Sequence, residues 1–264
     1  MASGWSTERV LITVRTYPVP ATKGLEVSST AAISERGKWI RLFPVPYRSL
    51  PKEKRFKKYQ WIEVALKKAS DPRPESYHIN IDTIKLGRLV PPNRGWSTRR
   101  AILKPLIRPS LCAIQKERDL KGHPTLGIFK PAKIGRLLIV ADSADWTPKQ
   151  KSILGQKTFG FASAPRAELE KIPFQFSYEF TCNEDGCKGH RLLCTDWEMA
   201  EAYRTWRKSY GDQWEEKFHA KFERDMIEKF DTHFYVGTLS QHPKNWIIVG
   251  LFYPPKSANQ DLFQ

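Results

Sequence analysis

The sequence contains no run of about 18 apolar residues, the length that a helix needs to cross a bilayer. It has four cysteines among 264 residues, too few for the disulfide framework of a secreted protein. The first residues show no basic stretch followed by an apolar one, so we expect no signal peptide. Together these absences predict a cytoplasmic protein with reduced thiols and no membrane partner.

Sequence motifs of common enzyme classes are also absent. There is no glycine-rich nucleotide-binding loop of the Walker or Rossmann type, and no nucleophile elbow. The carboxylates lack the spacing of a nuclease motif, and Asp196 with Glu198 fits the start of a helix better. We therefore expect a binding protein rather than an enzyme. His233 and His242 are the candidates for acid–base chemistry, and Cys112 is expected to be a structural cysteine.

Acidic residues are scarce in the first part of the chain. Residues 1–150 contain 29 basic and 12 acidic side chains, whereas residues 151–264 contain 15 basic and 16 acidic ones. The net charge of the whole chain is +16. Such an excess creates a long-range field that attracts polyanions, of which nucleic acid is the commonest in a cell. The sequence predicts a nucleic-acid partner and leaves RNA and DNA as alternatives.

Many of these basic residues alternate with aromatic ones in three clusters. Lys and Arg neutralise phosphates, while aromatic rings stack on unpaired bases. The alternative is that the aromatics belong to the core and the charges to a solvated loop. Arg41 shares a strand face with Trp39 and Phe43, which favours a binding surface. The predicted nucleic-acid-binding residues are Lys38, Arg41, Arg48, Lys54, Arg55, Lys57, Lys58, Arg94, Trp96, Arg99, Arg100 and Lys104.

The first part of the chain is predicted to be rich in β-structure. Val10, Ile12 and Val14 recur with the period of two that is typical of a half-buried strand. Arg36-Gly37 is consistent with a hairpin turn or with a longer loop, and prolines confine the strand ends to edges or loops. Short strands at this spacing favour a small barrel of the OB or PUA-like kind. The expected strands are residues 9–16, 26–34, 38–45, 60–67 and 76–84.

The second part is predicted to be α+β, so that the chain divides into a basic β-rich region, 1–145, and an α+β region, 146–264. Helical spacing and capping residues predict one helix from about Asp196 and a second with an apolar stripe. A near-continuous apolar run predicts a buried strand at 135–141. The other expected elements are a helix at 110–120, strands at 174–181, 232–238 and 246–252, and the stripe Trp214, Phe218, Phe222 and Met226.

The most specific local pattern is Cys182-x4-Cys187-x2-His190-x3-Cys194. Zinc favours four tetrahedral sulfur and nitrogen ligands, and short loops between ligands lower the entropic cost of closing the site. Gly186 and Gly189 allow the positive φ angles that tight metal loops need. We predict a structural Zn2+ bound by Cys182, Cys187, His190 and Cys194, with His233 or His242 as alternatives to Cys194.

These patterns together predict a nucleic-acid-binding adaptor or recognition protein stabilised by zinc. The first alternative is a metal-dependent nuclease or another nucleic-acid-processing enzyme. The second is a scaffold that binds proteins. The aromatic and proline-rich segment 242–256 either closes the core or, if exposed, docks a protein partner through the C-terminal half.

Overall fold

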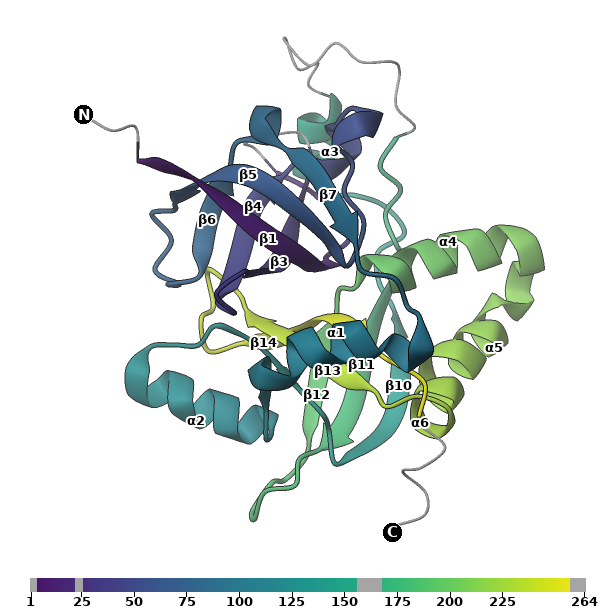
Figure 1. The fold of residues 1–264 in the computed structure, drawn as a ribbon. Coiled ribbons are helices and arrows are strands. Elements are labelled where there is room, and N and C mark those ends of the chain that lie inside the picture. Colours follow the sequence, from purple (N-terminus) through teal and green to yellow (C-terminus); the bar gives the residue numbers. More distant parts are fainter. Residues whose placement is uncertain (1–3, 22–25, 156–167, 257–264) are drawn as a thin grey trace. The chain divides into compact units, whose positions relative to one another are not determined.

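The computed structural model describes residues 4–21, 26–155 and 168–256 and shows a mixed α+β protein (Figure 1). The chain forms two compact units, one from residues 1–89 and 141–174 and the other from residues 90–140 and 175–264. This division differs from the one predicted at residue 145, because residues 90–140 belong to the second unit and residues 146–174 to the first. As a result the first unit has a net charge of +10 and the second +6.

A closed five-stranded β-barrel forms the first unit. Its strand order is β1-β3-β4-β6-β5, and β5 pairs again with β1. The pairing of β4 with β6 is parallel and the other pairings are antiparallel. This confirms the predicted barrel. The strands are β1 (Trp5–Arg15), β3 (Glu26–Ser34), β4 (Trp39–Val45), β5 (Gln60–Lys68) and β6 (Ser76–Ile79).

The barrel closes because β1 is long enough to pair on both sides. Its first part pairs with β5, and its second part pairs with β3 across a register shift between Ile12 and Val14. Alternate side chains point inwards, so Val10 and Ile12 are buried with Leu42 and other apolar residues. The turn between β3 and β4 contains Gly37 with a φ of 70°, as the Arg36-Gly37 pair predicted.

The last predicted strand of this unit is shorter than expected. It ends at Ile79, because the side chain of Asn80 accepts a hydrogen bond from the Asp82 N–H and starts a 3-10 turn at Ile81–Thr83. A further strand, β7 (Lys85–Leu89), then pairs with β5 outside the closed barrel. The other elements of this unit are β2 (Val19–Pro20), 3-10 turns at Tyr47–Ser49 and Lys52–Lys54, and α3 (Pro148–Gly155).

A seven-stranded mixed sheet forms the centre of the second unit. Its strand order is β10-β11-β12-β14-β13-β9-β8. The strands β13 and β14 form the predicted antiparallel pair, while β12 runs parallel to β14. The strands are β8 (Ile107–Arg108), β9 (Leu126–Phe129), β10 (Lys133–Ala141), β11 (Phe174–Thr181), β12 (His190–Cys194), β13 (His233–Thr238) and β14 (Trp246–Phe252).

The predicted apolar stripe is confirmed, since Trp214, Phe218, Phe222 and Met226 are all buried. Phe218 stacks on Phe176 of β11 with ring centroids 4.5 Å apart, which holds these helices against the sheet. The helices of this unit are α1 (Ser97–Leu103), α2 (Leu111–Lys121), α4 (Trp197–Tyr210), α5 (Trp214–His219) and α6 (Asp225–Glu228), with 3-10 turns at Arg94–Trp96, Lys104–Leu106 and Gly211–Gln213 and a π-helical stretch at Ala220–Arg224.

Two features of this unit bear on the sequence predictions. The strand expected to be buried at 135–141 is instead largely exposed, with only Leu137 buried, because β10 is the outer strand of the sheet. In the segment 242–256, Trp246 and Phe252 are buried and so contribute to the core. No helix among the described residues is long and apolar enough to cross a membrane.

Candidate metal centre and basic surfaces

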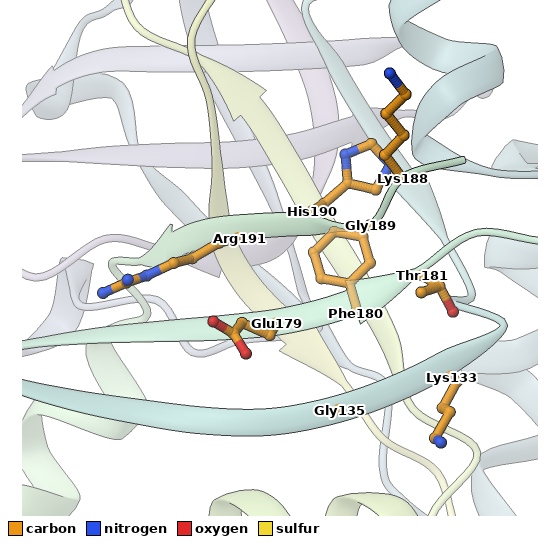
Figure 2. A pocket seen from close by; sticks show the side chains of 9 residues that line it. All are labelled: Lys133, Gly135, Glu179, Phe180, Thr181, Lys188, Gly189, His190 and Arg191. Atoms are coloured by element: carbon orange, nitrogen blue, oxygen red, sulfur yellow. The ribbon is translucent and has the colours of Figure 1, made fainter. Parts of the chain in front are cut away.

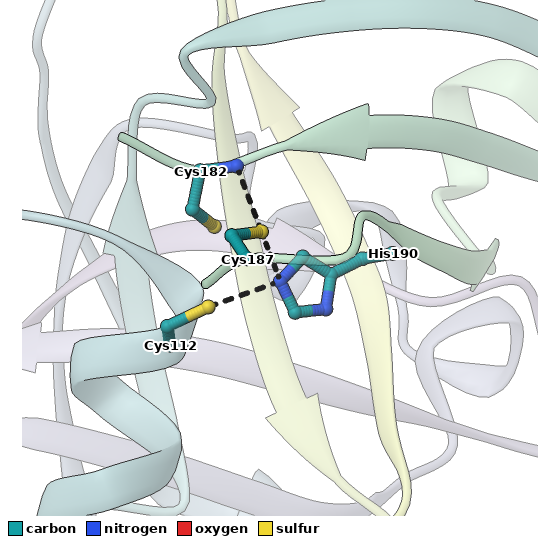
Figure 3. A group of neighbouring side chains, drawn as sticks. All are labelled: Cys112, Cys182, Cys187 and His190. Carbon is teal, nitrogen blue, oxygen red and sulfur yellow. Dashed lines mark hydrogen bonds between the residues drawn. The ribbon is translucent and has the colours of Figure 1, made fainter. Parts of the chain in front are cut away.

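Four potential metal ligands come together in the second unit (Figure 3). They are Cys112, Cys182, Cys187 and His190, whose ligand atoms all lie within 4.8 Å of one another. Cys112 lies in the first turn of α2, and Cys182 directly follows β11. Cys187 lies in the loop between β11 and β12, and His190 is the first residue of β12. Three separate elements thus contribute to one cluster.

The distances within this cluster are close to those of a four-coordinate metal site. The Nε2 atom of His190 lies 3.2 Å from the Cys112 sulfur and 3.5 Å from the Cys187 sulfur. A tetrahedral zinc with Zn–S bonds of about 2.3 Å and a Zn–N bond of about 2.0–2.1 Å separates its ligand atoms by about 3.4–3.8 Å. The four side chains therefore fit a single ion after small adjustments.

The loop between β11 and β12 has the backbone conformation that a metal loop needs. Gly186 and Gly189 have φ angles of 80° and 87°, the region that favours glycine. The backbone N–H of Cys182 donates a hydrogen bond of 3.4 Å to the Cys187 sulfur. Hydrogen bonds from the backbone of Cys182 and of Gly189 lower the pKa of the Cys187 thiol. The loop thus favours the thiolate, which is the form that binds metal.

The other ligands lie in a less polar environment. Burial, together with the neighbouring Cys182 and Cys187, raises the pKa of the Cys112 thiol to about 12. Burial also lowers the pKa of His190, which keeps the imidazole neutral and able to coordinate a cation. Thiols this close repel one another when ionised, and a divalent cation between them would relieve that repulsion.

Helix α2 is held in place by its N-cap and by its packing. Ser110 is the N-cap and accepts a hydrogen bond of 2.9 Å from the Ala113 N–H. Ile114 packs on Gly127 of β9, where an added Cβ would lie only 3.0 Å from the Ile114 Cδ1. These contacts fix the helix turn that carries Cys112.

Cys194 is not part of this cluster, which corrects the predicted ligand set. His190 and Cys194 begin and end the extended strand β12, where four residues span about 13 Å. Cys194 is buried, and its sulfur lies 3.4 Å from the Met199 sulfur. His233 and His242 do not replace it: His233 is buried with its Nδ1 2.9 Å from the Asp231 carbonyl oxygen, and His242 is exposed. The place of the fourth ligand is taken by Cys112.

Two of the predicted nucleic-acid-binding residues are buried, which corrects their assignment to a surface. Arg41 is 3% exposed and lies within the barrel unit, next to Ser76 and the charged Arg73. Arg99 is 7% exposed, and its Nε donates to the Val90 carbonyl oxygen at 2.9 Å. Neither side chain is therefore exposed for contact with a phosphate.

Trp96 also makes internal contacts. Its ring lies 5.7 Å from that of Phe252 and 5.5 Å from that of Tyr253, and the Arg99 guanidinium lies 4.6 Å from its centroid. The residue has a φ of 64°, which is unusual for a large side chain. It remains half-buried, so it does not offer a free ring to a base.

Several of the other predicted cations have partners within the protein. Arg48 pairs with Glu26 at 2.8 Å, and Lys54 donates to the Asp82 carbonyl oxygen at 2.9 Å. Arg55 donates to the Leu50 carbonyl oxygen at 2.8 Å, and Arg100 pairs with Asp231 at 2.6 Å. Lys58 is half-buried beside the Tyr59 ring. Lys38, Lys57, Arg94 and Lys104 are exposed.

The predicted basic set is also divided between the two units. Lys38 to Lys58 belong to the barrel unit, whereas Arg94 to Lys104 belong to the second unit. The predicted basic region, 1–145, therefore contributes binding candidates to both units.

Comparison with known families divides the chain near residue 106, at a different place from the boundary between the two compact units. Residues 107–264 match the model of a domain of unknown function (DUF8757). The chain belongs to the DUF8757 family. Residues 6–105 match a second domain of unknown function (DUF8758), and no curated protein matches the chain. The DUF8757 region contains all four residues of the cluster, including Cys112, while the DUF8758 region contains the five strands of the barrel.

Proposed function

We propose that the protein is a nucleic-acid-binding adaptor or recognition protein whose second unit contains a structural zinc site. The convergence of three cysteine sulfurs and one histidine nitrogen carries the zinc part of this proposal. The net charge of +16 and the exposed, unpaired cations support the nucleic-acid part.

The composition of the ligand set favours zinc in a structural role. Thiolate and imidazole ligands suit Zn2+, whereas Mg2+ and Ca2+ prefer oxygen. A catalytic zinc has three protein ligands and an open position, but here four protein ligands are present. The ion would connect the start of α2 to the loop between β11 and β12, because Cys112 lies on the helix and the other ligands lie at the loop. Its role would be to hold these elements together.

The exposed cations support binding to a polyanion. Lys38, Lys57, Arg94 and Lys104 form no ion pair with any carboxylate of the described residues. Free surface cations of this kind release counterions when they contact phosphates, which drives binding at low salt. We further propose that the barrel is of the OB or PUA-like kind, and barrels of the OB kind bind oligonucleotides through a strand face and loops. The barrel unit is also the more basic of the two.

A salt-dependent binding panel tests the proposal. The zinc-loaded full chain is titrated with labelled single- and double-stranded RNA and DNA at several salt concentrations. About five phosphate contacts predict a slope of log K against log salt near −4.5 on a duplex and near −3.5 on a single strand. A substituted chain with K38Q, K57Q, R94Q and K104Q should bind more weakly with a shallower slope. Absence of binding at low salt, or a flat salt response, would contradict the function.

A further inference from the structure

A hollow with a volume of about 480 Å³ lies next to the metal cluster, on the side of β10, β11 and β12 (Figure 2). Its wall includes His190, which is also one of the four residues of the metal cluster. A volume of this size is within the range of sites that bind small molecules or one unit of a polymer, about 300–1,000 Å³. The lining residues are Lys133, Gly135, Glu179, Phe180, Thr181, Lys188, Gly189, His190 and Arg191.

The border of the hollow is positively charged. Lys133, Lys188 and Arg191 are exposed, and Figure 2 shows them on three different sides of the hollow. None of the three forms an ion pair with a carboxylate of the described residues. Many other cations of this chain do form such pairs, for example Arg100 with Asp231. These three cationic groups therefore remain available to a ligand.

The one carboxylate in the wall is already neutralised. Arg136 donates to both oxygens of Glu179, at 2.7 and 3.4 Å. This interaction and the charge of Arg191 lower the pKa of Glu179, so the carboxylate is ionised and paired. Since Arg136 compensates Glu179, the three remaining cations determine the charge of the hollow. Their total of +3 also exceeds the net charge of −1 that a Cys3His zinc centre would carry.

Two glycines line the hollow, and neutral hydrogen-bond donors lie beside them. A side chain at Gly135 would have its Cβ only 3.2 Å from the Glu179 carbonyl oxygen, and Gly189 has a φ of 87°. Thr181 is exposed. The Nδ1 atom of His190 has no hydrogen-bond partner among the described residues, whereas metal-bound histidines usually donate from their second nitrogen to an oxygen.

From these observations we infer that the hollow binds a phosphate group of a polynucleotide. This inference rests on the proposed function and assigns one contact of the nucleic acid to the second unit. Three long cationic side chains provide charge from different directions, and the Thr181 hydroxyl and His190 N–H provide hydrogen bonds to phosphate oxygens. The phosphate would then lie beside the metal centre, held by residues outside the set predicted from the sequence.

The test compares two triple variants with the same change in charge. K133Q/K188Q/R191Q removes the cations of the hollow, and K116Q/K208Q/K244Q removes three exposed lysines elsewhere in the second unit. Affinity for the oligonucleotide that binds best is measured over a salt series. We expect the first variant to bind at least tenfold more weakly, with a slope shallower by about 0.7, because the hollow holds one phosphate and each phosphate contact on a single strand contributes about 0.7. The control should stay within twofold of the wild type.

The zinc content and the circular dichroism spectrum of each variant are also measured. These controls are needed because Lys188 directly follows Cys187 of the cluster, so that its substitution can affect zinc binding or folding. If the first variant loses zinc, the double variant K133Q/R191Q replaces it, with an expected loss of about fivefold. Equal weakening by both triple variants would overturn the inference and leave nucleic-acid binding intact.

Absence of oligonucleotide binding by the wild type would contradict the proposed function instead. In that case the hollow is tested with inorganic phosphate and a mononucleotide, by amide NMR shifts of residues 188–191. Shifts confined to those residues would support a phosphate site that serves a free ligand. No shifts would overturn the inference.

Discussion

The Ser110 hydroxyl donates a hydrogen bond of 2.7 Å to the Glu184 carboxylate, across 74 positions of the chain. The same hydroxyl accepts the Ala113 N–H as the N-cap of α2. Glu184 lies in the loop between Cys182 and Cys187, and Ser110 lies two residues before Cys112. One side chain thus connects the two segments that carry the cysteines of the metal cluster.

Substitution S110A should destabilise the second unit by about 1–2 kcal/mol, because it removes both the helix cap and the link to Glu184. It should also weaken zinc binding, since the turn carrying Cys112 is no longer held at the loop. Urea unfolding and competition with a zinc chelator measure the two effects. E184Q retains an acceptor for the Ser110 hydroxyl and provides the control with a smaller loss. Equal effects of both variants would mean that the helix cap is unimportant.

Substitution C112S should abolish binding of one zinc per chain, because it removes one of four ligands. C194A should retain the ion, since Cys194 contacts Met199 within the core. Native mass spectrometry gives the metal content of both variants, and thermal unfolding gives their stability. Retention of zinc by C112S together with its loss from C194A would contradict the four-residue site.

Stability of the second unit should fall as the pH decreases below about 6.5. Burial lowers the pKa of His233 despite the neighbouring Asp231, while Lys130 and Arg100 oppose protonation further. The unfolded chain therefore binds a proton at a pH where the folded chain does not, and each such proton contributes up to about 1.4 kcal/mol per pH unit. H233Q should reduce this slope in urea unfolding between pH 5 and 8. H242Q, at an exposed position, should leave it unchanged.

Substitution F218A should cost about 3–5 kcal/mol of unfolding free energy, because Phe218 is fully buried and stacks on Phe176. I227A changes an exposed residue of the following turns and should cost less than about 1 kcal/mol. Chemical denaturation of the two variants provides the comparison. Similar losses would show that the stripe is not the contact that holds the helices to the sheet.

Substitutions of two arginines from one predicted cluster should change different properties, namely stability for Arg99 and nucleic-acid affinity for Arg94. R99Q should lower the free energy of unfolding by about 2 kcal/mol, because Arg99 is buried and the substitution removes its hydrogen bond to the Val90 carbonyl oxygen. R94Q should leave stability unchanged and weaken nucleic-acid binding a few-fold, because Arg94 is exposed. Thermal unfolding and binding titrations measure the two properties. A loss of affinity in R99Q without loss of stability would reverse the two assignments.

The strands of the barrel could be predicted because their signals are local. The period-two pattern around Val10 and the glycine of the turn at Gly37 depend only on adjacent residues. The same is true of the stripe from Trp214 to Met226. The identity of Cys112 as a cluster member could not be found in this way, because its distance from Cys182 is set by the packing of α2 on β9.

Cys194 was predicted from its spacing, which assumed a loop after His190. The backbone is instead extended from His190 to Cys194, so proximity in sequence does not bring the two side chains together. For a related reason, a count of charged residues does not identify the arginines that lie at the surface. Arg41 and Arg99 contribute to the net charge as much as surface arginines do, and only the tertiary structure shows that they are buried.

During synthesis the barrel can close only after its last strand has been made. Strand β1 leaves the ribosome first, but one of its partners, β5, begins about 50 residues later at Gln60. Strand β6, which joins β4 to β5, is complete only at Ile79. Until then the sheet has unpaired edges, and such edges pair readily with other chains. A nascent chain that stalls before Ser76 would therefore expose edges that the finished barrel does not have.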